Sequence, residues 1–388
     1  MKKGTLAFAA RIETRLAAAG LLAALLAAGC AGERAPASVE TADRAPLAQA
    51  IDAHLSERRP SGAFLFAVDG RVVFAKGYGV LREGGPPLTA DAVFPVGSLT
   101  KQFTAAAVLR LAERRKLRLE DRLGRFFPDA PADKMTITVQ QLLAHNSGLA
   151  RNAGDVYDRV APQEARRRIF AQPLASAPGA QHAYSNSGYI LLGQIVERVS
   201  GRSLGDFFEQ QLFRPAGMAR TGYPSARFAG APIPRGYDRP KFGEIYSATP
   251  MSESGGQDPR FRFGNGGVLS TVGDLYLWVR ALSGGRIVSR RWIAEMQAPH
   301  ALITPDGKYR YGYAWVVEDS RSGRMLWHNG VWYSYYSEIR YFPDAGVIGI
   351  GFTNRQQDEI FDQSFAGALK LVLKAAAGPR PPGGPSAP

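Results

Sequence analysis

Cysteine is almost absent from this chain of 388 residues, which contains only Cys30. No intramolecular disulfide can form, so a scaffold held together by disulfides is excluded. The fold must instead be stabilised by an apolar core. A composition that is 45% hydrophobic and 21% charged is ordinary for a globular protein and supplies enough material for a sizeable one.

Apolar runs long enough to cross a membrane are also lacking near the N-terminus. The run at residues 16–28 is apolar but short, whereas a spanning helix needs about 20 apolar residues. It follows a basic start that includes Lys2, Lys3 and Arg15. This arrangement predicts a removed signal peptide over residues 1–30 rather than a permanent transmembrane helix.

Cys30 follows Leu26-Ala27-Ala28-Gly29, which is similar to the end of a bacterial lipoprotein signal. The pattern predicts that Cys30 becomes the lipidated first residue and attaches the protein to a membrane of the bacterial cell envelope. Leucine is commonest where Ala27 stands, and an ordinary signal peptide cut just beyond Cys30 is the alternative. Residues 31–44 are predicted to be a flexible tether and residues 377–388 a disordered tail.

Lysine is scarce, since only ten of the 48 basic residues are lysine, and the formal net charge is +14. Such a charge favours anionic partners such as cell-wall polymers or lipid headgroups. The excess of arginine, together with abundant alanine, glycine and proline, more simply indicates a composition bias. No dense basic run with interleaved aromatic residues occurs, so no nucleic-acid partner is predicted. The oligomeric state is left open.

Strand-like segments occur early and late in the chain, with helical ones between them. A helix is predicted over 46–57, a hairpin over 63–80 with its turn at Asp69-Gly70, and mostly helical structure from about 98 to 290. Later strands are predicted over 311–318, 324–330, 337–343 and 346–354, and a last helix over 360–376. We therefore expect an α/β (α+β) domain over 45–376, with an antiparallel sheet flanked by terminal helices and an inserted, mainly α-helical lobe. The cleft between the two parts is the expected ligand site.

Ser98 and Lys101 form an S-x-x-K motif at the start of a predicted helix. A serine there points its hydroxyl toward the positive end of the helix dipole, and a residue three further on returns to the same face. A buried lysine releases its proton more easily and can then accept the serine proton. The alternative is that Ser98 only caps the helix and Lys101 lies on the surface.

Two further groups of residues carry possible chemistry. The Tyr184 phenol can assist proton transfer, and the Asn186 amide can hold a substrate carbonyl, although Tyr184-Ser185-Asn186 also fits a plain turn. His328 and Gly330 lie at the end of a predicted strand. A glycine there allows close backbone approach, and strand N–H groups together with that of Ser98 suit an oxyanion hole. The alternative for His328 is a half-buried strand residue.

The motifs occur in the order S-x-x-K, Y-x-N and H-x-G, at positions 98, 184 and 328. This order and spacing resemble the serine β-lactamase and penicillin-binding-protein superfamily, and most closely its class C β-lactamase and DD-carboxypeptidase branch. The segments LLAHNSGL (142–149) and GNGGVLSTVGDL (264–275) add to the resemblance, which extends over about residues 45–375.

The resemblance implies a β-lactamase/transpeptidase-like fold and a serine hydrolase that acts through an acyl-enzyme. Ser98 would be the acylated nucleophile, with Lys101 and Tyr184 as the proton-transfer pair. Asn186 would contact the substrate amide, and the backbone N–H groups of Ser98 and Val331 would form the oxyanion hole. No metal ion or organic cofactor is implied.

Two departures from the family pattern concern the third motif. His328 stands where most β-lactamases have lysine, and Asn329 replaces the usual threonine. A histidine with an ordinary pKa of about 6.5 is largely neutral at pH 7–8 and can form a hydrogen-bond link to Ser98 or Tyr184. The Asn329 amide can donate to a substrate carboxylate. These departures favour poor β-lactam turnover.

The expected substrate is a small-molecule or peptide acyl donor: a D-amino-acid peptide, a cell-wall-related compound, a β-lactam or a simple ester. A β-lactamase proper and a catalytically weak penicillin-binding or sensor protein remain the alternatives. A second candidate nucleophile is Ser203, within a G-x-S-x-G pattern typical of α/β-hydrolases. The preceding segment has helical spacing, so a helix N-cap is the preferred interpretation of Ser203.

Overall fold

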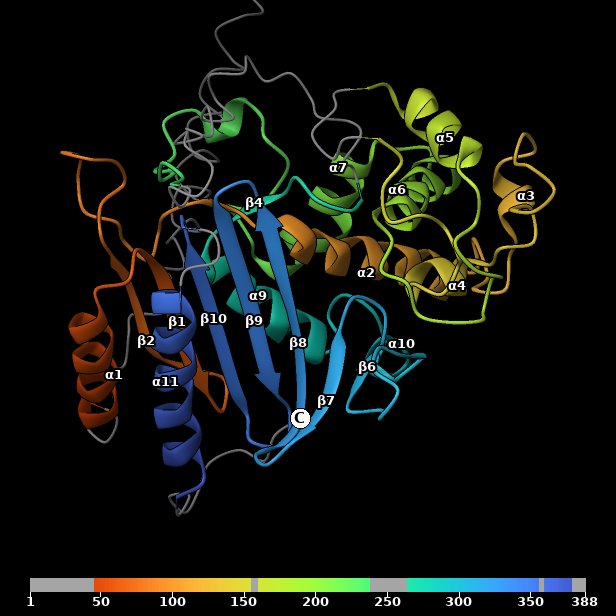
Figure 1. Ribbon diagram of the computed structural model, residues 1–388. Helices are drawn as coiled ribbons and strands as arrows, with labels where there is room; N and C mark the ends of the chain where they lie inside the picture. Colours follow the sequence, from red (N-terminus) through yellow and green to blue (C-terminus); the bar gives the residue numbers. More distant parts are fainter. Residues whose placement is uncertain (1–44, 155–159, 238–263, 356–358, 379–388) are drawn as a thin grey trace, which may run out of the picture. The chain divides into compact units, whose positions relative to one another are not determined.

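The computed structural model describes residues 45–154, 160–237, 264–355 and 359–378 (Figure 1). The predicted signal peptide with Cys30, the tether 31–44 and most of the predicted tail lie outside the described residues. Residues Pro46–Pro388 form one compact unit. Among the described helices, none combines the length and the apolar character that a membrane crossing requires.

The helices of the described residues fall into two terminal ones and a central group. The α-helices are α1 (Ala45–Arg58), α2 (Thr100–Glu113), α3 (Leu123–Phe126), α4 (Val139–Leu143), α5 (Pro162–Ala171), α6 (Asn186–Ser200), α7 (Leu204–Phe208), α8 (Arg214–Ala216), α9 (Val272–Ser283), α10 (Arg290–Gln297) and α11 (Glu359–Ala376). Short 3₁₀ turns lie at η2 (Gly97–Leu99) and η4 (Ala226–Phe228), and a π-helical turn at η3 (Glu209–Phe213).

Eight strands form one antiparallel sheet in the order β2-β1-β10-β9-β8-β7-β6-β5. They are β1 (Gly62–Val68), β2 (Arg71–Tyr78), β5 (Ala301–Leu302), β6 (Tyr309–Tyr311), β7 (Val316–Ser320), β8 (Gly323–Trp332), β9 (Tyr335–Phe342) and β10 (Val347–Thr353). A separate pair joins β3 (Phe94–Pro95) to β4 (Leu269–Ser270). The predicted antiparallel sheet, built from both ends of the chain around a helical insertion, is therefore confirmed.

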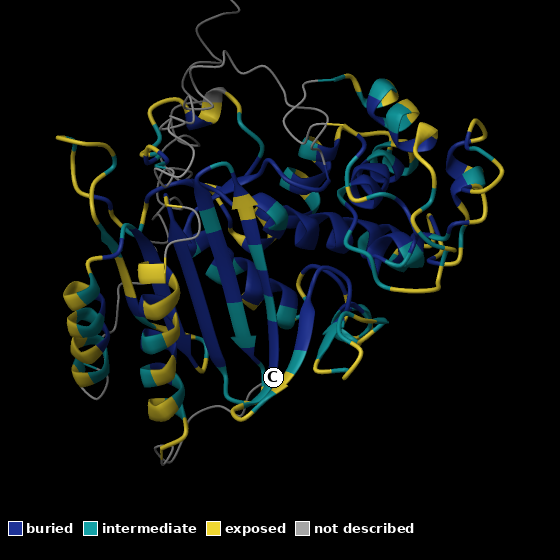
Figure 2. Cartoon of the chain, viewed as in Figure 1, coloured by how far each residue is buried: buried dark blue, intermediate teal, exposed yellow. Residues whose placement is uncertain are grey.

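The sheet is buried on both faces at β1 and β10. Successive residues of a strand point to opposite sides, so Leu65 of β1 joins the core shared with the central helices, whereas Phe64 and Phe66 join the core under α11. Phe64 stacks on Phe361 with ring centroids 5.5 Å apart, and the His54 side chain of α1 is hydrogen-bonded to the Ser364 carbonyl of α11. Figures 1 and 2 show α1 and α11 side by side, each with an exposed outer stripe, while α2 and the strands β1 and β10 are buried.

The predicted hairpin joins β1 to β2, and its turn residues Asp69 and Gly70 have φ angles of 49° and 73°. Such positive values suit Asp-Gly in a two-residue hairpin turn. The prediction of a single strand over 311–318 is wrong. Strands β6 and β7 are separated by residues 312–315, because Ala314 takes a φ of 60° and the chain turns back on itself.

Candidate active site

Ser98 lies in the 3₁₀ turn η2, directly before α2. Gly97 has a φ of 51°, and a Cβ atom on it would lie 2.6 Å from the backbone nitrogen of Val331. A Cβ atom on Gly330 would lie 2.9 Å from the Ser98 nitrogen and 2.0 Å from the Val96 carbonyl oxygen. Glycine at both positions thus allows the backbones of η2 and β8 to meet. The geometry suits a pair of converging N–H groups at Ser98 and Val331.

Lys101 is fully buried beneath Ser98 on the first turn of α2. Its Nζ lies 2.8 Å from Asn186 Oδ1, 2.9 Å from the Asn265 carbonyl oxygen and 3.1 Å from Ser98 Oγ. The first two partners only accept hydrogen bonds, so they take both N–H groups of a neutral amine. The lone pair of that amine is then left for the Ser98 hydroxyl, the one neighbour of the three that can donate to it.

The pKa values of Lys101 and Tyr184 are displaced in opposite directions. Burial lowers the pKa of Lys101 well below its ordinary value, and the charge of Arg151 lowers it further. Burial raises the pKa of Tyr184 to about 12, although a hydrogen bond with Ser98 and the Arg151 charge act against the rise. At neutral pH Tyr184 is therefore a phenol, and Lys101 is the group that loses a proton more readily than usual.

Asn186 begins α6 and links Lys101 to the preceding loop. Its Nδ2 donates to Asn152 Oδ1 at 2.8 Å, and its backbone N–H donates to the Arg151 carbonyl at 2.9 Å. Ser185 caps α6 by accepting the Gly188 N–H at 3.1 Å. The Asn186 amide thus holds Lys101 in place while it lines the candidate cavity.

His145 is a buried residue to which the sequence reasoning gave no role. Its Nδ1 accepts the Ser185 N–H at 3.1 Å, and its ring centroid lies 4.2 Å from that of Tyr184. Burial and the nearby Lys101 charge hold the pKa of His145 well below its usual range. The segment LLAHNSGL, noted for its family likeness, was the available signal. We infer that His145 positions Tyr184.

His328 is buried on β8, and its two ring nitrogens have partners other than those expected. Nδ1 lies 2.7 Å from the Asn329 carbonyl, which can only accept, so Nδ1 carries the hydrogen. Nε2 therefore accepts from the Tyr311 phenol at 3.0 Å. The expected link from His328 to Ser98 or Tyr184 is not found. Burial and the Lys101 charge lower the pKa of His328 to about 3, so the imidazole is neutral at pH 7.

The side chains that follow His328 divide between the two faces of the sheet. Asn329 shares a face with Glu338, is hydrogen-bonded to the Tyr336 phenol and also lines the cavity. An amide has two N–H donors, so donation from Asn329 to a substrate carboxylate stays a prediction. Trp332 lines the cavity, whereas the Tyr335 phenol donates to the Pro234 carbonyl at 2.7 Å. Of the four aromatic residues Trp332, Tyr333, Tyr335 and Tyr336, Trp332 is the one that lines the cavity.

A cavity of about 700 Å³ opens at Ser98. Tyr184, Asn186, His328 and Val331 line it, whereas Lys101 lies beneath its floor. The motifs therefore converge on one site, as their order predicted. The cavity is also lined by residues outside the three motifs that were not anticipated, among them Arg151, Asn152, His182, Asn265 and Tyr311. Within the described part of the chain, no three His, Cys, Asp or Glu side chains are grouped as a metal site.

Ser203 is excluded as an elbow nucleophile by its surroundings. It follows helix α6 rather than a strand, accepts the Asp206 N–H at 3.1 Å and caps α7. The N-cap interpretation is correct for this residue.

Comparisons with known proteins agree with this geometry. The family model described as Beta-lactamase matches residues 47–372. Penicillin-binding protein 4* of Bacillus subtilis is 28% identical over 333 residues, covering 81% of this chain and 72% of that protein. Esterase EstB of Burkholderia gladioli is 34% identical over 248 residues, covering 56% of this chain and 63% of EstB, which is less than two thirds of its length.

Solved structures share the fold. The octameric penicillin-binding protein homologue from Pyrococcus abyssi superposes with a TM-score of 0.72 at 27% identity, covering 84% of this chain and 77% of that one. D-amino acid amidase from Ochrobactrum anthropi SV3 superposes with a TM-score of 0.69 at 22% identity, covering 86% and 98%, and supports the fold alone. From the family match, which spans most of the chain, together with these relatives, we conclude that the protein belongs to the Beta-lactamase family and is a serine hydrolase.

Proposed function

We propose that the protein hydrolyses small esters or D-amino-acid amides through an ester of Ser98, and that β-lactam turnover is not its main activity. The observation that carries the proposal is the three-way contact of buried Lys101 with Asn186, Asn265 and Ser98. This arrangement matches a neutral lysine ready to accept a serine proton.

In the proposed reaction, Lys101 takes the Ser98 proton while Ser98 Oγ forms a bond to the substrate carbonyl carbon. The negative charge on the carbonyl oxygen is stabilised by the N–H groups of Ser98 and Val331. As the carbon–oxygen or carbon–nitrogen bond of the substrate breaks, Lys101 and Tyr184 deliver a proton to the leaving atom. Water then attacks the Ser98 ester, and the same groups take its proton and return one to Ser98.

The substrate class follows from the neutral His328 and from the relatives. A lysine at this position would present a permanent positive charge to an anionic group of a β-lactam, and a neutral imidazole that already accepts from Tyr311 presents none. One relative is named as an esterase, and another, AmpH of Escherichia coli, as a D-alanyl-D-alanine-carboxypeptidase/endopeptidase, with 30% identity over 57% of both chains. Esters and D-amino-acid amides are accordingly the first substrates to try.

The test is hydrolysis of an ester and D-peptide panel, with covalent labelling by a fluorescent penicillin and a fluorophosphonate. Ser98→Ala is expected to lose labelling and several orders of magnitude in kcat/KM while remaining folded. Ser203→Ala is the matched control and should retain both. Activity that survives in Ser98→Ala, or rapid cephalosporin hydrolysis by the wild type, would overturn the proposal. Labelling of the wild type without turnover would indicate a penicillin-binding sensor instead.

We also propose that the mature protein is attached to the bacterial cell envelope through lipidated Cys30. The support is the Leu26-Ala27-Ala28-Gly29-Cys30 segment and the basic start before it. Mass spectrometry of the mature N-terminus tests this directly. A lipidated Cys30 is expected, and Cys30→Ser should release the protein from membranes. A mature chain that starts beyond residue 30 would contradict the anchor.

A further inference from the structure

Strand β8 loses its neighbour on one side just before the candidate site. Strand β7 pairs with β8 from Ser320–Gly323 up to Val316–Trp327, whereas the pairing of β8 with β9 continues to Trp332–Tyr335. Beyond Trp327, therefore, no described strand pairs with that edge of β8. The cavity that contains Ser98 passes this edge and extends toward β6, β7 and Ile303, which follows β5, because residues of these segments line it.

The lining of this extension is apolar and aromatic. Tyr311 of β6, Val316 of β7 and Trp327 of β8 are directly paired across the three strands and therefore share one face. Tyr309 lies two residues before Tyr311. Ile303 lies two residues after Ala301, which pairs with Tyr311, so both side chains share that face. All five line the cavity, and the Tyr309 and Trp327 rings meet edge to face with centroids 6.4 Å apart.

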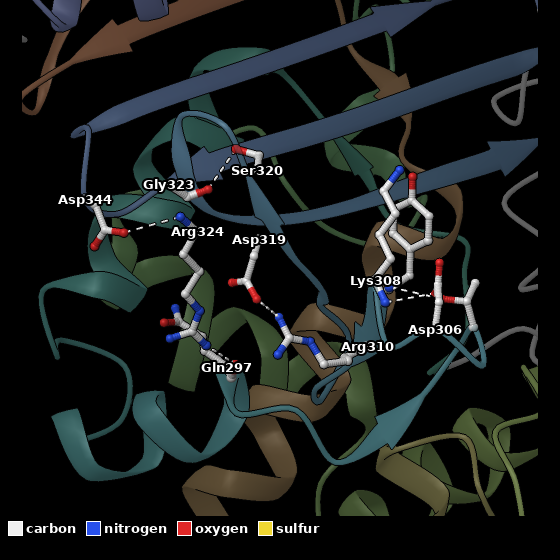
Figure 3. Close-up of polar contacts among 11 residues, drawn as sticks. Gln297, Asp306, Lys308, Arg310, Asp319, Ser320, Gly323, Arg324 and Asp344 are labelled. Carbon is white, nitrogen blue, oxygen red and sulfur yellow. Dashed lines mark hydrogen bonds and ion pairs between the residues drawn. The ribbon is translucent and has the colours of Figure 1, made fainter.

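Polar contacts fix this wall from its other face. Arg310, between Tyr309 and Tyr311, points away from the row and forms an ion pair with Asp319, as Figure 3 shows. The turn before β6 is closed by Asp306, which accepts the Lys308 N–H at 3.0 Å. These contacts hold the apolar row in place before a ligand binds. Binding therefore costs less conformational entropy of the protein.

The position of Tyr184 indicates which part of a substrate reaches this row. Ser98 faces β8 at Gly330, and at about 3.3 Å per residue Trp327 lies roughly 10 Å along the strand on one side, with Trp332 on the other. The Tyr184 ring lies toward the Trp327 side, 6.3 Å from the His328 ring. A group that protonates the leaving atom must lie beside it. The leaving group is thereby directed toward Ile303, Tyr309 and Trp327.

We propose that the face formed by Ile303, Tyr309, Tyr311, Val316 and Trp327 is a subsite for an apolar leaving group, the alkyl or aryl alcohol of an ester or the corresponding amine. This inference rests on the proposed function and adds the substrate class that the site selects. Each methylene buried there should raise kcat/KM by about fourfold until the row is covered.

The experiment varies the two halves of an ester separately. One series holds acetate constant and lengthens the alcohol from methyl to hexyl and benzyl, while the other holds methanol constant and lengthens the acyl chain. For the wild type, kcat/KM should rise by well over tenfold along the alcohol series. Ile303→Ala should remove roughly tenfold of that rise, and Ile303→Glu nearly all of it, so the loss relative to the wild type should grow with the length of the alcohol.

The matched control is Leu302, the neighbouring residue on β5, which is 58% exposed and points to the opposite face. Leu302→Ala and Leu302→Glu should leave both series unchanged. A flat alcohol series, Ile303 variants that behave like the wild type, or an effect confined to the acyl series would overturn the subsite while leaving the proposed function intact.

A binding measurement decides the matter even where no ester is turned over. Benzyl alcohol should bind to folded Ser98→Ala protein, observed by saturation-transfer NMR, and binding should be lost when Ile303→Glu is added. Binding that persists in the double variant would refute the subsite, whereas a failure of every substrate in the wild type would refute the proposed function alone.

Discussion

At the scale of single residues, the protonation state of Lys101 decides whether Ser98 can react. Its Nζ is surrounded by two obligate acceptors and the Ser98 hydroxyl, and burial favours the uncharged amine. A guanidinium cannot release a proton near neutral pH. Lys101→Arg should therefore lose at least a thousandfold in kcat/KM on any substrate that the wild type hydrolyses, and a variant with the wild-type rate would remove Lys101 from the mechanism.

Arg151 tunes that protonation state from the rim of the cavity. Its guanidinium lies 5.1 Å from the centre of the Tyr184 ring, and its charge lowers the pKa of Lys101. If neutral Lys101 is the base, kcat/KM rises as the pH passes the Lys101 pKa. Arg151→Gln should raise the Lys101 pKa. The acidic limb of the kcat/KM profile should then move to higher pH, and kcat/KM at pH values below that pKa should fall. Arg151→Lys keeps the charge and should leave the limb in place. A limb that is the same in wild type and Arg151→Gln would show that the charge has no such effect.

His328 makes a second residue-scale prediction, about substrate charge. With its pKa lowered to about 3, the imidazole stays neutral throughout pH 5.5–8.5. The ratio of kcat/KM for paired substrates with and without a terminal carboxylate should therefore be constant across this range. A preference for the carboxylate that strengthens as the pH falls through 6.5 would mean that His328 becomes protonated in the working enzyme.

At the scale of elements, catalysis depends on how closely η2 approaches β8. The two backbones meet at Gly97 and Gly330, where a single Cβ atom would clash with backbone atoms of the other element. The Ser337 hydroxyl adds to the junction by donating to the Val96 carbonyl at 2.9 Å. The N–H groups proposed for the oxyanion hole thus owe their positions to two glycines.

Gly330→Ala should push β8 away from Ser98 and lower kcat by about a hundredfold, the typical cost of losing one oxyanion donor. The effect should appear in kcat more than in KM, because the interaction strengthens in the transition state. Gly273→Ala on α9 is the control, since a Cβ atom there meets its nearest neighbour, Thr271 Oγ1, at 3.7 Å. Similar losses in both variants would indicate general destabilisation, and an active Gly330→Ala would argue against the proposed oxyanion hole.

At the scale of the whole molecule, the site lowers stability in acid. His145 and His328 are buried as neutral imidazoles with lowered pKa values, whereas the unfolded chain takes up protons near pH 6.5. The unfolded state therefore binds more protons below pH 6.5, and the free energy of unfolding falls as the pH drops from about 6.5 toward 3.

Proton uptake by His328 in the unfolded chain should by itself lower the free energy of unfolding by as much as about 2 kcal/mol between pH 7 and pH 5. The melting temperature should fall over that interval, and His328→Gln should flatten the slope even where it lowers the melting temperature at pH 7. Thermal unfolding of wild type and variant at several pH values provides the measurement. An unchanged slope in His328→Gln would show that His328 is protonated in the folded protein.

The sequence by itself determined which chemical groups the site contains and roughly where the fold begins and ends. S-x-x-K at a helix start, Y-x-N before another helix and H-x-G at a strand end are local patterns. The Asp69-Gly70 turn is local too, because its backbone angles depend only on adjacent residues. The sheet built from both ends of the chain followed from the order of strands and helices.

Tertiary structure alone decided the environment of those groups. The burial of Lys101, the lowered pKa of His328 and the contacts of Arg151 and His145 depend on residues tens to hundreds of positions away. The turn at Ala314 that divides the expected strand 311–318 likewise follows from the packing of Gly312 against the backbone of Met296 and Ala298. Desolvation and hydrogen-bond partners are set by what lies nearby in space, and these determine which side chain carries a proton and which substrate group finds an apolar wall.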